Sequence, residues 1–142
     1  MNKQNFYDLN FDQLKNFLID KVEIDDKKAK MRTQQMFNAV YKKNIKNFNE
    51  LTTFGLELRE KIKNLISLEK PKIIDIQKSK DGTIKFLLEL KDKRNVETVL
   101  IPDKSQSRYT ICLSVSVGCY LSCEFCATAQ ISKKLVRNLT PG

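Results

Sequence analysis

The chain has 142 residues, which is room for one domain or for one domain and part of another. Its hydrophobic fraction of 41% can support a core, and no apolar run approaches the length that crosses a membrane. The first residues, Met1 to Leu14, lack the apolar stretch of a secretory signal. Four cysteines, three of them within eight positions, favour a reducing compartment over a disulfide scaffold, so we expect a cytoplasmic protein.

The chain is strongly basic. Its formal net charge is +9, from 26 Lys and Arg against 17 Asp and Glu. This imbalance favours polyanionic partners, above all RNA for a cytoplasmic protein. A lysine-rich surface without any specific partner has the same composition, so charge alone leaves RNA binding open.

The first half of the chain has apolar residues at helical spacing. Asn10 is a candidate N-cap for the first stretch, residues 29–43 form the second, and Asn47 with Glu50 resembles a capping box. We expect a helical domain over residues 1–70, with the apolar positions in the core of a small bundle. These positions are Phe11, Leu14, Phe17 and Leu18, then Met36, Phe37, Val40 and Tyr41, then Leu58, Ile62, Leu65 and Ile66.

The periodicity then changes from helix to strand. Residues 72–78 and 83–90 flank Asp81-Gly82, which is a strong hairpin-turn dipeptide. Residues 95–101 follow a polar turn and form a third candidate strand. We therefore expect connecting antiparallel strands over residues 71–104.

A fourth candidate strand spans Tyr109 to Val117, with small or polar residues alternating with apolar ones. The small or polar side is what a strand shows to an active-site cavity, and we expect the apolar side to pack against helices. Gly118 ends the strand. Thr110, Cys112, Ser114 and Ser116 point one way, and Ile111, Leu113, Val115 and Val117 point the other.

Cys119, Cys123 and Cys126 form a C-x3-C-x2-C cluster after this strand. Thiolates hold iron–sulfur clusters, usually four of them to one 4Fe-4S cluster. A set of three leaves one iron without a protein ligand, so that this iron can bind a substrate or a cofactor. The spacing resembles the signature of the radical S-adenosylmethionine (SAM) superfamily.

Two other interpretations of the three cysteines stay open. Structural zinc prefers four ligands in paired knuckles, whereas this chain has one incomplete knuckle and no histidine. Inert buried thiols are the other interpretation, although chance rarely places three at this spacing. Cys112 precedes Gly118 by about 20 Å of extended strand, which makes it a poor fourth ligand, and on its residues alone it is a small strand residue.

Several stretches carry, in order along the chain, a resemblance to a known family. The Glu-Thr-Val-x-Ile-Pro segment and the cysteine cluster with its flanks are the most specific of them. Together they resemble the dual-specificity RNA methyltransferases of the RlmN type, which are related to the Cfr methyltransferases. The stretches are residues 30–37, 58–60, 79–83, 96–102, 112–130 and 135–140.

The resemblance implies a site. Cys119, Cys123 and Cys126 would hold a 4Fe-4S cluster that binds SAM, and reductive cleavage of SAM would give a deoxyadenosyl radical. Glu97 matches the family's proton acceptor, although from the residues alone it is an exposed strand carboxylate. Cys112 matches the cysteine that forms a transient disulfide with a methyl-carrying cysteine and so releases the RNA adduct.

The resemblance also implies the reaction and the partners. The family adds a methyl group to carbon-2 of an adenine in 23S ribosomal RNA (rRNA) and of an adenine beside the tRNA anticodon. We therefore expect 23S rRNA and tRNA as partners, together with an electron donor such as a flavodoxin system. No membrane partner is expected.

The chain departs from the family in two ways. Ser116 stands where the family usually has glutamine, and members of the family are more than twice as long. A Gly-rich SAM-binding strand and a distal methyl-carrying cysteine are not found in this sequence. We expect an α+β protein in which residues 105–142 begin a truncated radical SAM β/α barrel, with its first strand and its cluster loop.

Three hypotheses about function remain. In the first, the chain is the N-terminal portion of an RlmN-type methyltransferase and is inactive alone. In the second, it is half of a split enzyme whose separately encoded C-terminal half completes the barrel. In the third, it is a non-catalytic, basic RNA-binding module built on the helical half.

Overall fold

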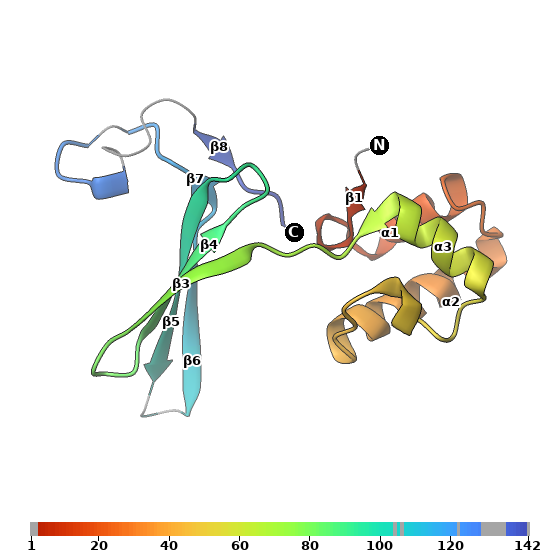
Figure 1. Ribbon diagram of the computed structural model, residues 1–142, viewed down its shortest axis with the longest axis horizontal. Coiled ribbons are helices and arrows are strands. Elements are labelled where there is room, and N and C mark those ends of the chain that lie inside the picture. The colour runs from red at the N-terminus through yellow and green to blue at the C-terminus, as the bar shows by residue number, and fades with distance from the viewer. Residues whose placement is uncertain (1–2, 104, 106, 122, 129–135, 142) are drawn as a thin grey trace. The chain divides into compact units, whose positions relative to one another are not determined.

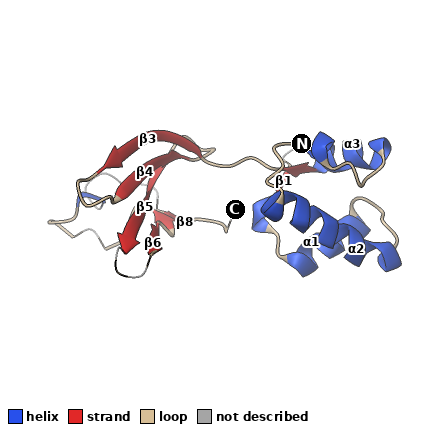
Figure 2. Cartoon of the chain, turned by 90° about the horizontal axis from the view of Figure 1, so that it is seen from below, coloured by secondary structure: helices blue, strands red, loops and turns tan. Residues whose placement is uncertain are grey.

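The structure is a computed structural model, and the chain in it divides into two compact units, Met1–Glu69 and Lys70–Thr140. Figures 1 and 2 show that the first unit is mainly helical and the second mainly β-stranded. Ala129, Gln130 and Leu135, which carry part of the family resemblance, lie outside the described residues. The described residues are 3–103, 105, 107–121, 123–128 and 136–141.

The first helix begins where the sequence predicts it. Helix α1 (Phe11–Asp20) has Asn10 as its N-cap. The Asn10 side-chain oxygen accepts a hydrogen bond from the Gln13 amide at 2.9 Å, and the Gln13 side chain accepts one from the Asn10 amide at 2.9 Å. This reciprocal pair satisfies amides that have no partner within the helix. The predicted N-cap is confirmed.

The second helix starts earlier than predicted and changes its winding near its end. Helix α2 (Asp26–Phe37) follows Asp25, whose side chain accepts a hydrogen bond from the Lys27 amide at 3.0 Å. It continues as a π-helical turn over Asn38–Lys42. The apolar pattern predicts one helix over residues 29–43 because a single π turn leaves the apolar stripe nearly continuous.

Helix α3 (Leu56–Leu65) follows a 3-10 turn at Phe48–Glu50. The predicted capping box is present in that turn. The Asn47 side chain accepts a hydrogen bond from the Asn49 amide at 2.9 Å, and the Glu50 carboxylate accepts one from the Asn47 amide at 3.1 Å. Asparagine therefore replaces the usual serine or threonine without loss of the motif.

A short parallel pairing joins the two ends of the helical unit. Ile66, which the sequence places in the last helix, belongs instead to β2 (Ile66–Ser67). This strand pairs with β1 (Gln4–Asn5), which precedes a 3-10 turn at Phe6–Asp8. Two-residue strands carry no sequence pattern of their own, so only the packed helices determine this register.

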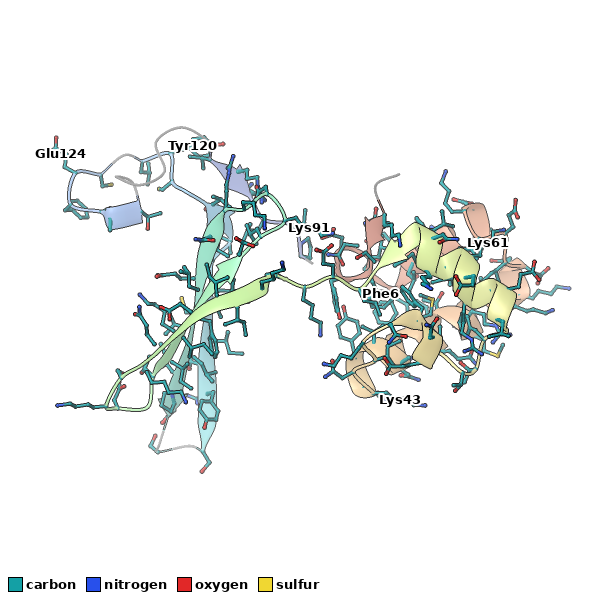
Figure 3. The ribbon with its side chains drawn as sticks, in the orientation of Figure 1. Phe6, Lys43, Lys61, Lys91, Tyr120 and Glu124 are labelled. Carbon is teal, nitrogen blue, oxygen red and sulfur yellow. The ribbon has the colours of Figure 1, made fainter. Side chains whose placement is uncertain are left out.

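The helical unit holds the main hydrophobic core. Phe6 (labelled in Figure 3) is fully buried, and its ring centroid lies 5.4 Å from that of Phe37 and 5.8 Å from that of Tyr41. Each large apolar side chain that is fully buried contributes about 1.5–3 kcal/mol to stability. The prediction of a core position is wrong for Tyr41, which is 55% exposed. Predicted core residues that are buried are Leu14, Leu18, Met36, Val40, Ile62 and Ile66.

The second unit is built on an antiparallel sheet in the order β3-β4-β5-β6. The hairpin around Asp81-Gly82 is present as predicted, and Gly82 has a φ of +94°, which glycine adopts without strain. The last predicted strand of the connecting region extends two residues further than expected. The strands are β3 (Lys72–Lys78), β4 (Ile84–Glu89), β5 (Asn95–Asp103) and β6 (Arg108–Leu113).

Asp81 organises the turn between β3 and β4. Its carboxylate accepts hydrogen bonds from the Ser79 hydroxyl, from the Thr83 amide at 2.9 Å and from the Thr83 hydroxyl at 3.0 Å. These bonds, with that of Ser79 first, lower the pKa of Asp81 from its ordinary value of 3.8 to about 2. The carboxylate therefore stays ionised well into the acid range and holds the turn together.

The fourth predicted strand is broken in two. It leaves the β5 ladder after Leu113, and β7 (Ser116–Val117) pairs instead with β8 (Arg137–Asn138). The expectation that its apolar side packs against helices is wrong for Ile111, Leu113 and Val115, which are 60–77% exposed, whereas Val117 is buried. Alternation predicts which side is apolar, but whether another layer covers it is a tertiary property. Its place in a barrel stays a prediction.

Candidate catalytic face and cysteine loop

One face of the four-stranded sheet carries both residues for which the sequence predicts catalytic roles. Cys112 of β6 lies opposite Val99 of β5, and Glu97 lies two residues before Val99 on the same strand. Side chains alternate along a strand, so Glu97, Val99 and Cys112 project from the same face. Glu97 and Cys112 are diagonal neighbours, and the Cα atoms of such a pair lie on the order of 7–8 Å apart. The sheet register thus brings the two predicted residues together.

Lys85 of β4 lies on the same face. It is opposite Val99 in the β4–β5 register, and its Nζ lies 3.0 Å from Oε1 of Glu97. Solvent still reaches 39% of the Lys85 side chain and 52% of the Glu97 side chain. Three adjacent strands therefore present an ammonium group, a carboxylate and a thiol side by side. Lys85, Glu97 and Cys112 form what is called below the sheet-face cluster.

Ser114 fastens the end of β6 to the main chain of Glu97. Its hydroxyl donates to the Glu97 carbonyl oxygen at 2.7 Å, and its amide donates to the same oxygen at 3.3 Å. Both bonds use the backbone of Glu97, so they leave its carboxylate on the open face. The Cys112 thiol is exposed as well. Both predicted catalytic groups are therefore accessible to a reactant.

The cysteine loop begins at Gly118, whose φ of +72° turns the chain away from β7. The Ser116 hydroxyl, at the position where the family usually has glutamine, donates to the Gly118 carbonyl at 3.2 Å. Further along, the Leu121 amide donates to Sγ of Cys119 at 3.4 Å. Amide donors to sulfur stabilise negative charge there and tune iron–sulfur potentials. Tyr120 and Glu124 of this loop are labelled in Figure 3.

The three loop cysteines lie in one segment, but their thiols do not converge on a single metal site. Among the described residues, no three Cys, His, Asp or Glu side chains lie together closely enough to hold a metal ion. Cys119, Cys123 and Cys126 are each half-buried thiols rather than disulfides. Three thiols within eight positions are a donor set suited to an iron–sulfur cluster. Binding one would require the loop to gather its thiols, and the ligand role stays a prediction.

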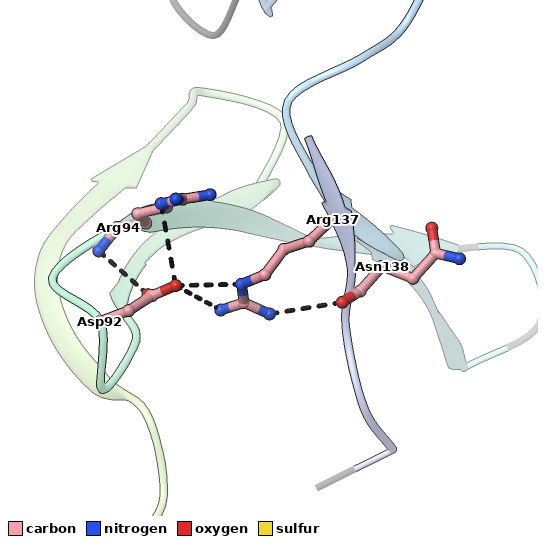
Figure 4. A network of polar contacts seen from close by, with 4 residues as sticks. All are labelled: Asp92, Arg94, Arg137 and Asn138. Atoms are coloured by element: carbon pink, nitrogen blue, oxygen red, sulfur yellow. Dashed lines mark hydrogen bonds and ion pairs between the residues drawn. The ribbon is translucent and has the colours of Figure 1, made fainter. Parts of the chain in front are cut away.

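An ion pair fixes the segment that follows the loop. Figure 4 shows Arg137 of β8 reaching Asp92 in the turn between β4 and β5. Arg137 Nε and Nη2 donate to Oδ2 of Asp92 at 2.9 and 2.8 Å. The Arg137 bond is the main reason that the pKa of Asp92 is lowered, and the Arg94 amide adds to it. Because Asp92 lies on the hairpin, it ties β8 and β7 to the sheet that carries the cluster.

The comparisons with known proteins point in one direction. Residues 4–68 match the sequence model of the ribosomal RNA large subunit methyltransferase N-terminal domain. A protein named dual-specificity RNA methyltransferase RlmN from a Nitratiruptor species is 40% identical over 124 residues, which cover 80% of this chain and 34% of the relative. A protein of the same name from Campylobacter fetus is 37% identical over 150 aligned positions, covering 98% and 39%.

This chain belongs to the RlmN family. The crystal structure of a radical SAM methyltransferase from Sphaerobacter thermophilus superposes with a TM-score of 0.76 at 29% identity, and the match covers 96% of this chain and 38% of that one. The chain thus spans between about a quarter and two fifths of the length of the RlmN relatives it matches. No helix in the described part of the chain is both long enough and apolar enough to cross a membrane.

Two features of the candidate site have no direct signal in the sequence. Lys85 has the spacing of an ordinary strand lysine, and only the register of β4 against β5 places it beside Glu97. The Arg137–Asp92 pair links a turn to a distant strand and has no local signal. The turn at residues 91–94 was recognised, and a register built outward from it could have suggested Lys85.

Proposed function

We propose that this chain provides the N-terminal part of a radical SAM methyltransferase that methylates carbon-2 of adenine in 23S rRNA and tRNA. The observation that carries the proposal is the position of Glu97 and Cys112 as neighbours on one open face. By family resemblance, Glu97 accepts a proton from an RNA adduct, and Cys112 forms the disulfide that releases the same adduct. Because both residues act on one adduct, their side chains must lie close together. The complete reaction would also use the part of the RlmN relatives that this chain does not span.

The residues divide the work between two places. Cys119, Cys123 and Cys126 would hold the 4Fe-4S cluster through their thiolates, and when bound it supplies the electron that cleaves SAM. Glu97 accepts the proton that leaves the adenine. The Cys112 thiolate attacks the sulfur of the methyl-carrying cysteine, and the disulfide forms as the sulfur–carbon bond to the RNA breaks. The electron pair of that bond stays with the carbon, which takes up a proton and becomes the methyl group of the freed RNA. The methyl-carrying cysteine belongs, by the resemblance, to the remaining length of the relatives.

Cluster binding can be tested on this chain alone. Anaerobic reconstitution with iron and sulfide is expected to load the wild-type chain, as measured by iron and sulfide content and by the electron paramagnetic resonance signal of the reduced cluster. Cys123→Ser should abolish loading, because two thiolates remain. Cys112→Ser is the matched control and should load like the wild type. Equal loading of both variants would contradict the ligand assignment.

The reaction requires a longer polypeptide. The Campylobacter fetus relative, with residues 1–142 of this chain in place of its matching segment, should produce 2-methyladenine in 23S rRNA and tRNA, detected by mass spectrometry. Glu97→Gln should remove the product, because the amide has no basic oxygen for the proton. Activity that survives Glu97→Gln would refute the role of this carboxylate. Supplying the two parts as separate chains tests the split-enzyme alternative.

The helical unit carries a second candidate function, which is RNA binding. Tyr41 is 55% exposed in the π-helical turn, and Lys42 and Lys43 beside it are exposed (Lys43 is labelled in Figure 3). The Tyr41 ring packs against Phe6 and Phe37 and is still partly exposed. A partly exposed aromatic ring next to two exposed ammonium groups suits a base and its phosphates. Replacing both lysines by glutamine should reduce the salt dependence of binding to a tRNA anticodon stem-loop by roughly 1.4–1.8 log units per log unit of salt. An unchanged slope would exclude this surface.

A further inference from the structure

We propose that Lys85 is a positioning residue that holds the Glu97 carboxylate beside Cys112. The proposal rests on the function proposed above, in which Glu97 accepts a proton, and it adds a residue to which no role has been given. Its starting observation is the 3.0 Å separation between Lys85 Nζ and Glu97 Oε1.

The register of the sheet gives this ion pair a direction. Lys85, Val99 and Cys112 form one row across three strands, on one face. Glu97 stands in the next row, two residues along β5. Its contact with Lys85 therefore draws the carboxylate along the strand toward the row that contains Cys112.

The ion pair also leaves the second carboxylate oxygen for chemistry. Lys85 contacts Oε1, and it is the one partner that the described residues offer to the Glu97 side chain. Glutamate has a long side chain that loses considerable freedom when it is ordered. One ammonium contact restricts that freedom while Oε2 stays available to accept a proton.

The Lys85–Glu97 ion pair is expected to contribute little to the stability of the fold. Both side chains are partly exposed, and ion pairs at such positions contribute little to folding because water and salt screen them. Loss of Lys85 is therefore expected to leave the sheet folded. A change in the reactivity of the Cys112 thiol or in turnover then reports on the sheet-face cluster and not on unfolding.

The first test uses this chain as it is. Site-resolved mass spectrometry measures how fast Cys112 reacts with anionic iodoacetate and with neutral iodoacetamide. Lys85→Met leaves the Glu97 charge unbalanced beside the thiol, so the iodoacetate-to-iodoacetamide rate ratio should fall by roughly two- to fivefold. Lys85→Arg should keep the wild-type ratio, and Lys85→Met combined with Glu97→Gln should restore it.

The matched control is Lys78→Met. Lys78 pairs with Ile84 in the β3–β4 register and projects from the opposite face, so its loss should leave the ratio unchanged. The proposal is overturned if Lys85→Met leaves the ratio at the wild-type value, or if Lys78→Met lowers it equally.

The second test uses the Campylobacter fetus relative that carries residues 1–142 of this chain. Lys85→Met should lower kcat for adenine methylation by roughly ten- to a hundredfold with KM for RNA unchanged, because a misplaced base slows chemistry and not binding. Lys85→Arg should recover most of the rate.

The two proposals fail in different ways. If Glu97→Gln is inactive while Lys85→Met turns over like the wild type, the positioning role is wrong and the proposed function stands. If the Campylobacter fetus relative that carries residues 1–142 of this chain is inactive without further substitutions, the proposed function loses its support. The iodoacetate-to-iodoacetamide rate ratio at Cys112 then decides by itself whether Lys85 holds Glu97 beside Cys112.

Discussion

The helical unit and the sheet unit differ in how they are held together. In the helical unit, Phe6, Leu14 and Met36 have no exposed surface and pack in a core that is bounded by capped helices. In the sheet unit, Ile111 and Leu113 are 60% and 63% exposed, and the strands depend on their backbone ladder and turns. Side-chain burial dominates the first unit, and hydrogen-bond register dominates the second.

This difference matters because the candidate chemistry lies entirely in the sheet unit. Lys85, Glu97 and Cys112 are placed by register on three neighbouring strands, and a change of one residue in that register would move Glu97 to the other face. The cysteine loop follows the same sheet. The proposed chemistry thus depends on the unit with the smaller core, which makes the turns and ion pairs around the sheet-face cluster important.

The largest expected effect is in the helical core. Leu14→Ala should destabilise the helical unit by about 2–5 kcal/mol, because it removes a fully buried side chain and leaves a cavity. Leu113→Ala on the sheet is the matched substitution and should change stability by less than about 0.5 kcal/mol, since its side chain is mostly exposed. Urea unfolding followed by far-ultraviolet circular dichroism measures both. Equal losses of stability in the two variants would contradict the conclusion that side-chain burial dominates only the helical unit.

A smaller effect is expected at the first helix cap. Asn10→Ala removes the acceptor for the Gln13 amide and should cost about 1 kcal/mol in the same urea experiment. Asn10→Asp keeps an acceptor and serves as the control. A loss in the alanine variant no larger than in the aspartate variant would mean that core packing alone defines the start of this helix.

The smallest effect concerns the turn of the sheet unit. Ser79→Ala should raise the pKa of Asp81 from about 2 toward 3.8, because the hydroxyl of Ser79 is the main group that lowers it. The depressed pKa stabilises the folded turn above pH 3.8, and that contribution is lost as the pH falls toward about 2. Carboxyl chemical shifts in an NMR titration give the midpoint. If the titration midpoint of Asp81 does not move, a group other than the Ser79 hydroxyl lowers its pKa.

Much of the local structure was accessible from the sequence. Asn10, the Asn47–Glu50 box and the Asp81-Gly82 turn are confirmed, because each is a short-range motif whose hydrogen bonds form between nearby residues. Glu97 and Cys112 were singled out by family resemblance, and their roles stay predictions. The break after Leu113 was missed because alternation continues through it in the sequence.

The sequence by itself therefore determined the helix caps, the hairpin turn, the family and the set of candidate residues. Only the tertiary structure decided that Lys85 meets Glu97, that both share a face with Cys112, and that Arg137 reaches Asp92. The physical reason is range. Caps and turns form between residues a few positions apart, whereas strand register and ion pairs between distant segments depend on how the whole sheet is assembled.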